Sequence, residues 1–445
     1  MSQPSPLSRI GWLLARPGSA VIVGFVIRAG WQYSLRMHGP YPIIEPVPYG
    51  YETGRIAASL AAGHGFGSPL HVPTGPTAWM TPLYPLLLAA VFRLTGILSW
   101  AGFLIIGMLN CAFSALTAWP VSAIGRKAFG EATGVTAGWL WVFLPTAVYY
   151  PVAWVWDTCL VTLLFALVLL ATLYLRGSTR ATAWGGYGLL LGLTALTNAA
   201  VVSLYPFYLA WAALPLRRRG MGWLRLPALA CAGFVLMMSP WWIRNYATFH
   251  RFIPLRSNFG LELWLGNNSR NPDIWSHWLH PDSDEGVMAE FKRLGEMAFM
   301  EAKQREAVEW IRAHPSDFVR DSIDRVADTW LGYDEPLWQV LRMHAGMRLL
   351  YLLSLVNVGI TFCGLLLAMR RRSDYGVLFG LSLVVFPLIY YVTHSSLRYR
   401  YPIEPVMALL FSYSVVTLVT AWWPGSTAAS ASRGPQGAGE MTPVA

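Results

Sequence analysis

Charged residues and cysteines are scarce in this sequence. Asp, Glu, Lys and Arg make up 13% of its 445 residues, about half the share that is usual in soluble domains. The four cysteines lie in apolar segments without metal-ligand spacing (Cys111, Cys159, Cys231 and Cys363). This pattern argues against both a disulfide framework and a cysteine metal site. No solenoid-length repeat and no cleavable signal peptide is evident.

Long apolar runs fill most of the chain instead. The composition is 55% hydrophobic with a mean hydropathy of +0.43, which predicts an all-α polytopic membrane protein. About ten transmembrane helices are expected, at 17–35, 99–124, 131–150, 153–175, 181–197, 200–216, 224–243, 345–368, 374–393 and 401–423. The net charge of +10 lies mostly in short loops between spans, where it sets topology, so we expect no nucleic-acid partner.

The basic clusters predict which loops face the cytoplasm. The stretch 79–96 is short and contains two prolines, and whether it crosses decides the sidedness of everything after it. If it crossed, all but the first basic cluster would lie outside, so the charge rule favours interfacial helices there. The clusters near 9–16, 126–127, 176–180, 217–225 and 370–372 then fall on one side, with both termini, and the positive-inside rule makes that side cytoplasmic. The predicted membrane domain covers 1–423. It includes a first outer loop with interfacial helices (36–98) and an extracytoplasmic helical segment (244–344), and a disordered cytoplasmic tail (424–445) follows it.

One outer turn breaks this charge pattern. The stretch 394–405 (HSSLRYRYPIEP) places Arg398, Arg400 and Glu404 between two apolar segments on the outer side. Charged groups against a membrane are costly unless they meet an anion or a water-filled cavity. Because the guanidinium fork matches phosphate oxygens, the stretch predicts a site for a lipid-borne phosphate.

Carboxylates occur at two further outer positions. Glu45 and Glu52 flank a PVPYGY segment in the first loop, and Arg55 lies three residues after Glu52, a spacing that suits either a site pair or an ordinary surface pair. Asp157 follows two tryptophans at the start of a span. It either faces the helix dipole, or ligates a metal or orients an acceptor. Arg28 lies near the outer end of the first span, where it can also snorkel.

In these motifs the chain resembles the GT-C superfamily of integral-membrane glycosyltransferases, and most of all the bacterial family-39-type proteins. That type includes protein mannosyltransferases and the lipid A aminoarabinose transferase. The resemblance covers nearly all of 9–423. The motifs that carry it are Arg28, the acidic loop running into 56–66, Pro82-Leu-Tyr84-Pro85, 125–130 (GRKAFG), 240–246 (PWWIRNY), 266–268 (GNN) and 398–405 (RYRYPIEP).

The resemblance implies transfer of a sugar from a polyprenyl-phosphate donor to an acceptor hydroxyl on the outer face, with inversion. The acceptor would be a glycan, a lipid or a protein. It also implies an integral protein of the bacterial inner membrane. The family's catalytic aspartate falls at about position 48 or 49, where this chain has Pro48 and Tyr49, so Glu52 and Glu45 are the nearest candidates for the base.

The remaining roles are also implied by the resemblance. Asp157 would orient the acceptor or help to hold a divalent metal ion. Four arginines would bind the lipid phosphate, namely Arg398, Arg400, Arg244 and Arg28. Six residues would contact substrate: Tyr49, Arg55, His64, Tyr84, Asn267 and Glu404.

Two other classes compete with this interpretation. A transporter or flippase of lipid-linked glycans would usually show internal repeats and charges near mid-membrane, and here the acids lie at span ends without a clear repeat. A polymerase or ligase acting on lipid-linked glycans would also need outer arginines.

Overall fold

A computed structural model describes residues 14–38, 49–220, 223–270, 274–332 and 345–422. These ranges fold into helices joined by turns, without a β-strand among them; Gly67 and Pro76 form an isolated bridge. The predicted all-α class is confirmed. Glu45 and the predicted tail at 424–445 lie outside the described residues.

Within the described ranges, seven of the ten predicted spans correspond to helical segments that are long and apolar enough to cross a membrane. They are α5 (Trp100–Phe129), α8 (Thr158–Leu175), η1 with α10 (Ala199–Leu204 and Tyr205–Arg218), α11 (Arg225–Phe249), α17 (Ala345–Arg370), α18 with α19 (Asp374–Val385 and Leu388–Val392), and α20 through η3 to α21 (Leu397–Arg400, Tyr401–Ile403 and Glu404–Trp422). The chain is therefore an integral membrane protein.

The other three predicted spans are α2 (Pro17–His38), α6 (Glu131–Phe143) and α9 (Ala181–Ala195). Helices α6 and α9 have 13 and 15 residues, fewer than the roughly 20 that a full crossing needs. The predicted span 131–150 is broken because Pro145 pushes Leu144 out of the helical region and starts a second helix, α7 (Pro145–Ala153). The stretch 79–96 contains α4 (Leu83–Thr95), which at 13 residues is also too short to cross.

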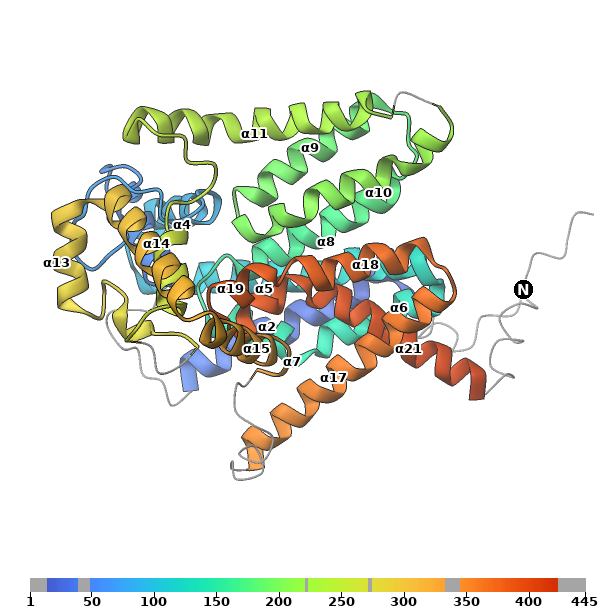
Figure 1. Cartoon of the computed structure of the whole chain (residues 1–445). Helices are drawn as coiled ribbons and strands as arrows, with labels where there is room; N and C mark the ends of the chain where they lie inside the picture. Colours follow the sequence, from blue (N-terminus) through green and yellow to red (C-terminus); the bar gives the residue numbers. More distant parts are fainter. Residues whose placement is uncertain (1–13, 39–48, 221–222, 271–273, 333–344, 423–445) are drawn as a thin grey trace, which may run out of the picture.

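The long helices pack into one bundle. Helix α5 lies against α2, α6 and α8, α9 lies along α11, and α17 lies along α21 (Figure 1). Basic residues gather at one end of the bundle, where Arg126 and Lys127 end α5 and Arg217 and Arg218 end α10. At the same end, Arg176 forms an ion pair with Asp374 at the start of α18.

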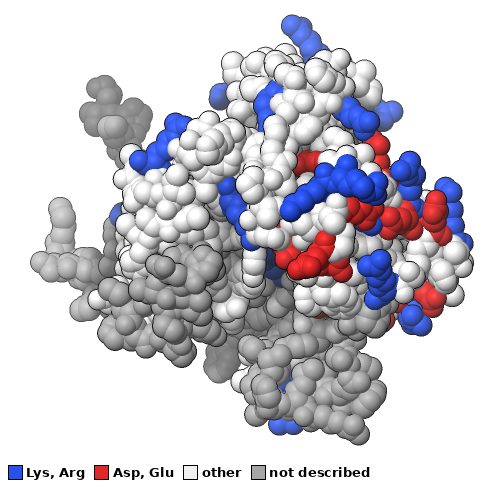
Figure 2. All heavy atoms as spheres, turned by 90° about the vertical axis from the view of Figure 1, so that its left-hand side faces the viewer, with Lys and Arg blue, Asp and Glu red and all other residues white. Residues whose placement is uncertain are grey.

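Shorter helices cover the opposite end. They are α3 (Glu52–Ala61) and α4 from the first loop, with α12 (Phe259–Gly266), α13 (Glu285–Leu294), α14 (Glu296–Ala313) and α15 (Pro315–Leu331). Helices α13 and α14 stand at the left of Figure 1 beside α4, and the Phe291 and Phe299 rings pack between them at 5.2 Å. Figure 2 shows this side, where acidic and basic side chains gather over one part of an otherwise largely uncharged face.

Candidate active site

The first loop brings Glu52 against the turn that precedes α8. Gly50 has a φ of +73°, and a β-carbon there would lie 2.0 Å from the carbonyl oxygen of Val155. Only glycine therefore permits this close approach. Helix α3 begins two residues later at Glu52, whose carboxylate is favoured by the N-terminal end of the helix dipole. The carboxylates of Glu52 and Asp157 consequently belong to one region of the structure.

Asp157 directs its carboxylate away from its own helix. It is the residue before α8, but its side chain does not cap the helix. Instead, Asn198 donates to its Oδ2 at 3.0 Å. Burial raises the pKa of Asp157, and the hydrogen bond from Asn198 and the charges of Arg398 and Arg256 offset this only in part. Asp157 is therefore a carboxylate with increased proton affinity.

Arg398 lies beside the same turn, on aromatic rings. Its guanidinium carbon is 4.5 Å from the centroid of the Trp156 ring and 5.2 Å from that of Tyr399. Its charge interacts with those of Asp157 and Glu52. No carboxylate among the described residues lies within the 4.0 Å of an ion pair with it. Arg398 thus presents a positively charged group that has no direct anionic partner in the described part of the chain.

A second group of charges adjoins this one, centred on Glu262 of α12. His394 and Glu262 share a hydrogen bond of 2.6 Å, and Arg256 and Asn258 donate to the other carboxylate oxygen at 2.9 and 2.6 Å. Burial disfavours the ionised form of Glu262. The bond from His394 and the positive charges of His394, Arg256 and His280 outweigh that effect and lower its pKa to about 2. The His394 ring stacks on Trp275 at 5.0 Å, so this group is rigidly held.

His280 connects the two groups. Its Nε2 lies 3.3 Å from Glu52 Oε1. Burial lowers the pKa of His280, but the bond to Glu52 and the charges of Glu52, Glu262 and Asp282 raise it more, for a net increase. The neighbouring Asp282 binds Arg55 of α3 and the backbone N–H of His71, the latter at 2.9 Å. The first loop is therefore fastened to the segment before α13 by two sets of polar contacts.

Three of the predicted site residues, Glu52, Asp157 and Arg398, come together here. Arg28 is placed elsewhere, fully buried among α2, α5, α6 and α7. It donates to the carbonyls of Trp141 and Ala147 at 3.0 and 2.8 Å. Four residues after each of these carbonyls stands a proline, Pro145 and Pro151, which has no N–H to offer. Arg28 therefore supplies the donors that two prolines remove.

The other predicted arginines also hold backbone carbonyls. Arg244 donates to Thr77 and Phe66 at 2.6 and 2.7 Å and so fixes the end of the first loop on α11. Arg400 donates to Trp330 in the last turn of α15 and pairs with the buried Glu404 at 3.2 Å. In contrast to Arg398, both guanidinium groups are therefore engaged by oxygens of the chain itself.

The remaining predicted residues are spread over the surroundings. Tyr49 and Tyr84 are buried, and their hydroxyls donate to Ser99 O and Asn110 Oδ1. Asn267 is buried and donates to the carbonyls of Leu263 and Val392. His64 is exposed beyond the end of α3.

Sequence reasoning missed Arg256, Glu262 and His280. They lie in the predicted extracytoplasmic segment 244–344, and the contacts that join this segment to the rest of the site come from distant parts of the chain, as with Glu262 and His394, 132 positions apart. His394 stands in the 394–405 stretch that the sequence singles out, but nothing in the sequence identifies Glu262 as its partner. No local spacing marks such a pair.

The residues around Asp157 do not suit a divalent cation. Among the described residues no group of three His, Cys, Asp or Glu side chains could hold a metal ion. The charges that act on Asp157 come from Arg398 and Arg256, and these repel a cation.

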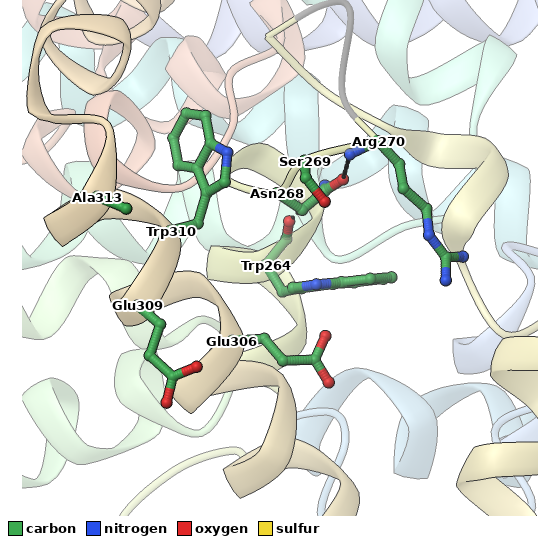
Figure 3. A pocket seen from close by; sticks show the side chains of 8 residues that line it. All are labelled: Trp264, Asn268, Ser269, Arg270, Glu306, Glu309, Trp310 and Ala313. Carbon is green, nitrogen blue, oxygen red and sulfur yellow. Dashed lines mark hydrogen bonds between the residues drawn. The ribbon is translucent and has the colours of Figure 1, made fainter.

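A pocket of about 410 Å³ lies on a different face of α12 (Figure 3). Trp264 belongs to α12, two residues after Glu262, and the opposite wall comes from α14. Its lining residues are Trp264, Asn268, Ser269, Arg270, Glu306, Glu309, Trp310 and Ala313. None of the residues of the Glu52, Asp157 and Arg398 group lines it.

No family model matches the sequence, and no curated protein matches it. Several solved structures do match the chain. The chain is similar to the oligosaccharyltransferase AglB from Archaeoglobus fulgidus in complex with an inhibitory peptide and a dolichol-phosphate, at 14% identity and a TM-score of 0.53, over 94% of this chain and 52% of that one. The apo form of the Archaeoglobus enzyme gives 13% identity and a TM-score of 0.50, over 92% and 52%. This chain thus spans about half the length of those proteins.

A further match is ArnT from Cupriavidus metallidurans bound to undecaprenyl phosphate, at 14% identity and 93% and 78% coverage. Its TM-score of 0.40 is too low to add to the fold assignment. AglB belongs to the GT-C superfamily. The chain therefore shares the fold of the AglB oligosaccharyltransferase, which agrees with the GT-C resemblance of its sequence motifs.

Proposed function

We propose that this chain transfers a sugar from a polyprenyl-phosphate donor to an acceptor hydroxyl on the outer face of the membrane. The observation that carries the proposal is the Arg398 guanidinium, which lies on the Trp156 ring, in the field of two carboxylates and without an ion-pair partner among the described residues. The AglB structure of the same fold holds a dolichol-phosphate, so a lipid phosphate is the first ligand to consider.

Arg398 is proposed as the main phosphate ligand, and Arg256, whose charge also acts on Asp157 although it is paired with Glu262, as a second source of positive potential. The contrast with Arg28, Arg244 and Arg400 supports this choice, because those three donate to backbone carbonyls. A guanidinium over an aromatic face has five N–H donors, and contact with the ring leaves those that point away from it for phosphate oxygens. The Trp and Tyr rings around it also provide apolar surface for the first carbons of a lipid chain.

Asp157 is proposed as the base, with Glu52 as a second carboxylate that orients the acceptor. Two observations support Asp157 over Glu52. Burial raises the pKa of Asp157, which makes it a better proton acceptor near neutral pH. Glu52 is already paired with His280, whereas the side-chain hydrogen bond that Asp157 accepts comes from the neutral amide of Asn198.

The reaction is a single displacement. The acceptor oxygen forms a bond to the anomeric carbon as the bond from that carbon to the phosphate oxygen breaks, and the configuration inverts. The hydroxyl proton passes to Asp157, and the electron pair leaves with the lipid phosphate. Arg398 and Arg256 stabilise the charge that develops there; loss of one such contact usually costs about 10²–10³ in rate.

The test is turnover by the purified full chain in proteoliposomes. Undecaprenyl-phosphate sugars are supplied with glycan, lipid or peptide acceptors, and both the free lipid phosphate and the glycosylated acceptor are measured. We expect Asp157→Asn and Arg398→Gln to lower turnover at least 10²-fold. Arg251→Gln, which removes an exposed pair with Glu301, should not. Movement of intact donor across the bilayer without bond cleavage would instead identify a flippase.

A further inference from the structure

A groove of about 500 Å³ lies at the arginine-rich end of the bundle, between α8 and α9. It is lined by Ala171, Tyr174 and Leu175 of α8, by Ser178 and Arg180 of the connecting turn, and by Ala183, Gly186, Tyr187 and Leu190 of α9. Helix α8 starts beside Asp157 and is 18 residues long, and the groove begins at Ala171 in its last part, so it lies roughly 20 Å or more along the helix from the proposed catalytic carboxylate. It is therefore separate from the donor site.

The wall of the groove is apolar and open. Ala171, Ala183 and Gly186 have small side chains or none, and a β-carbon at Gly186 would meet no atom within 4 Å. The neighbouring Tyr174 is 64% exposed. Such a surface on a membrane helix is suited to a hydrocarbon chain, because small residues leave a channel that a methylene chain can fill.

The mouth of the groove is cationic. Lys127, from the end of α5, places its Nζ 4.3 Å from the centroid of the Tyr174 ring, and Arg180 is exposed in the turn. Two neighbouring arginines have acidic partners, Arg126 with Glu131 and Arg176 with Asp374. Within the described ranges, no acidic side chain pairs with Lys127 or Arg180.

We propose that this groove binds an anionic phospholipid of the membrane leaflet at the arginine-rich end. One acyl chain lies against Ala171, Ala183 and Gly186, and the headgroup phosphate lies between Lys127 and Arg180. A soluble anion would use the two cations but not the apolar channel, and a neutral or zwitterionic lipid would fill the channel without compensating the charge. The combination of both features favours a lipid with net negative charge.

Native mass spectrometry of the full chain, released from nanodiscs, tests this proposal. With an equal mixture of phosphatidylglycerol and phosphatidylcholine, we expect preferential retention of phosphatidylglycerol. Lys127→Gln and Arg180→Gln should each lower that preference about fivefold, since a basic residue near an anionic surface contributes about that much. Arg218→Gln and Arg219→Gln remove exposed charges at the same end but outside the groove, and they should change it little.

Gly186→Leu tests the contribution of the apolar channel independently of the charges. The leucine side chain would fill the apolar wall while Lys127 and Arg180 remain, so retention should fall although the charge is unchanged. Equal loss in the Arg218 and Arg219 variants would reduce the effect to general surface attraction and overturn the proposal. Displacement by millimolar inorganic phosphate, or equal retention of both lipids, would also overturn it. These readouts do not depend on sugar transfer.

Discussion

Gly50→Ala is expected to separate the first loop from the turn that carries Asp157. Gly50 has a φ of +73°, and the added β-carbon would lie 2.0 Å from Val155 O. A carbon does not approach a carbonyl oxygen closer than about 3 Å, so the start of α3 or the 155–157 turn must move by about 1 Å. Glu52, two residues later, would move with it.

The control is Gly63→Ala. Gly63 also has a positive φ, +84°, but a β-carbon there meets no atom within 4 Å. Both variants therefore share the cost of an alanine in the left-handed region, about 1–2 kcal/mol. Only Gly50→Ala adds the displacement, and a misplacement of about 1 Å at a reacting centre can cost around 10²-fold in rate.

The assay compares turnover and thermal unfolding for the two variants in the same proteoliposomes. We expect similar melting temperatures within a few degrees, and a rate about 10²-fold lower for Gly50→Ala than for Gly63→Ala. Equal rates for the two variants would refute the reasoning, because they would show that the contact between the first loop and Val155 does not position the reacting groups.

Two other predictions concern charged groups outside the proposed phosphate contact. His280 has a raised pKa. Its pairing with Glu52 therefore stabilises the fold fully below the pKa of the unfolded chain, about 6.5, and this stabilisation is lost as the pH rises through the pKa of the folded chain. The melting temperature of the native chain should fall more between pH 6 and pH 9 than that of His280→Gln, and parallel curves would contradict this. Arg28→Leu removes the donor to the carbonyl of Trp141, at about 1–3 kcal/mol, and leaves the carbonyl of Ala147 with Ser114 alone. We therefore expect a lower melting temperature but affinity for undecaprenyl phosphate within about twofold of native. A specific loss of affinity at unchanged stability would place Arg28 in the phosphate site instead.

The sequence predicted the helical membrane fold because long apolar runs leave few alternatives. It could not show which arginines bind a phosphate, since an arginine near a membrane surface has the same sequence pattern whether its guanidinium contacts a phosphate or a backbone carbonyl. Arg28 is the exception in hindsight. Pro145 and Pro151 leave the carbonyls of Trp141 and Ala147 without helical donors, and both prolines are visible in the sequence.

The site could be predicted only in part for a related reason. Glu52 was found as a carboxylate of the first outer loop, and Asp157 and Arg398 because they stand at outer ends of apolar segments. Glu262, Arg256 and His280 lie in a polar segment where charge is ordinary. Their role depends on contacts such as Glu262 with His394, which arise from tertiary packing and leave no periodic signal.

The central claim is that Arg398 holds a lipid phosphate, and equilibrium binding of undecaprenyl phosphate to the purified full chain tests it most directly. Binding is followed by tryptophan fluorescence, since Trp156 lies under the guanidinium. Arg398→Gln should weaken binding about 10- to 100-fold, the value of a hydrogen bond to a charged group, while Arg251→Gln binds as the native chain does. Native affinity in a folded Arg398→Gln protein would contradict the account.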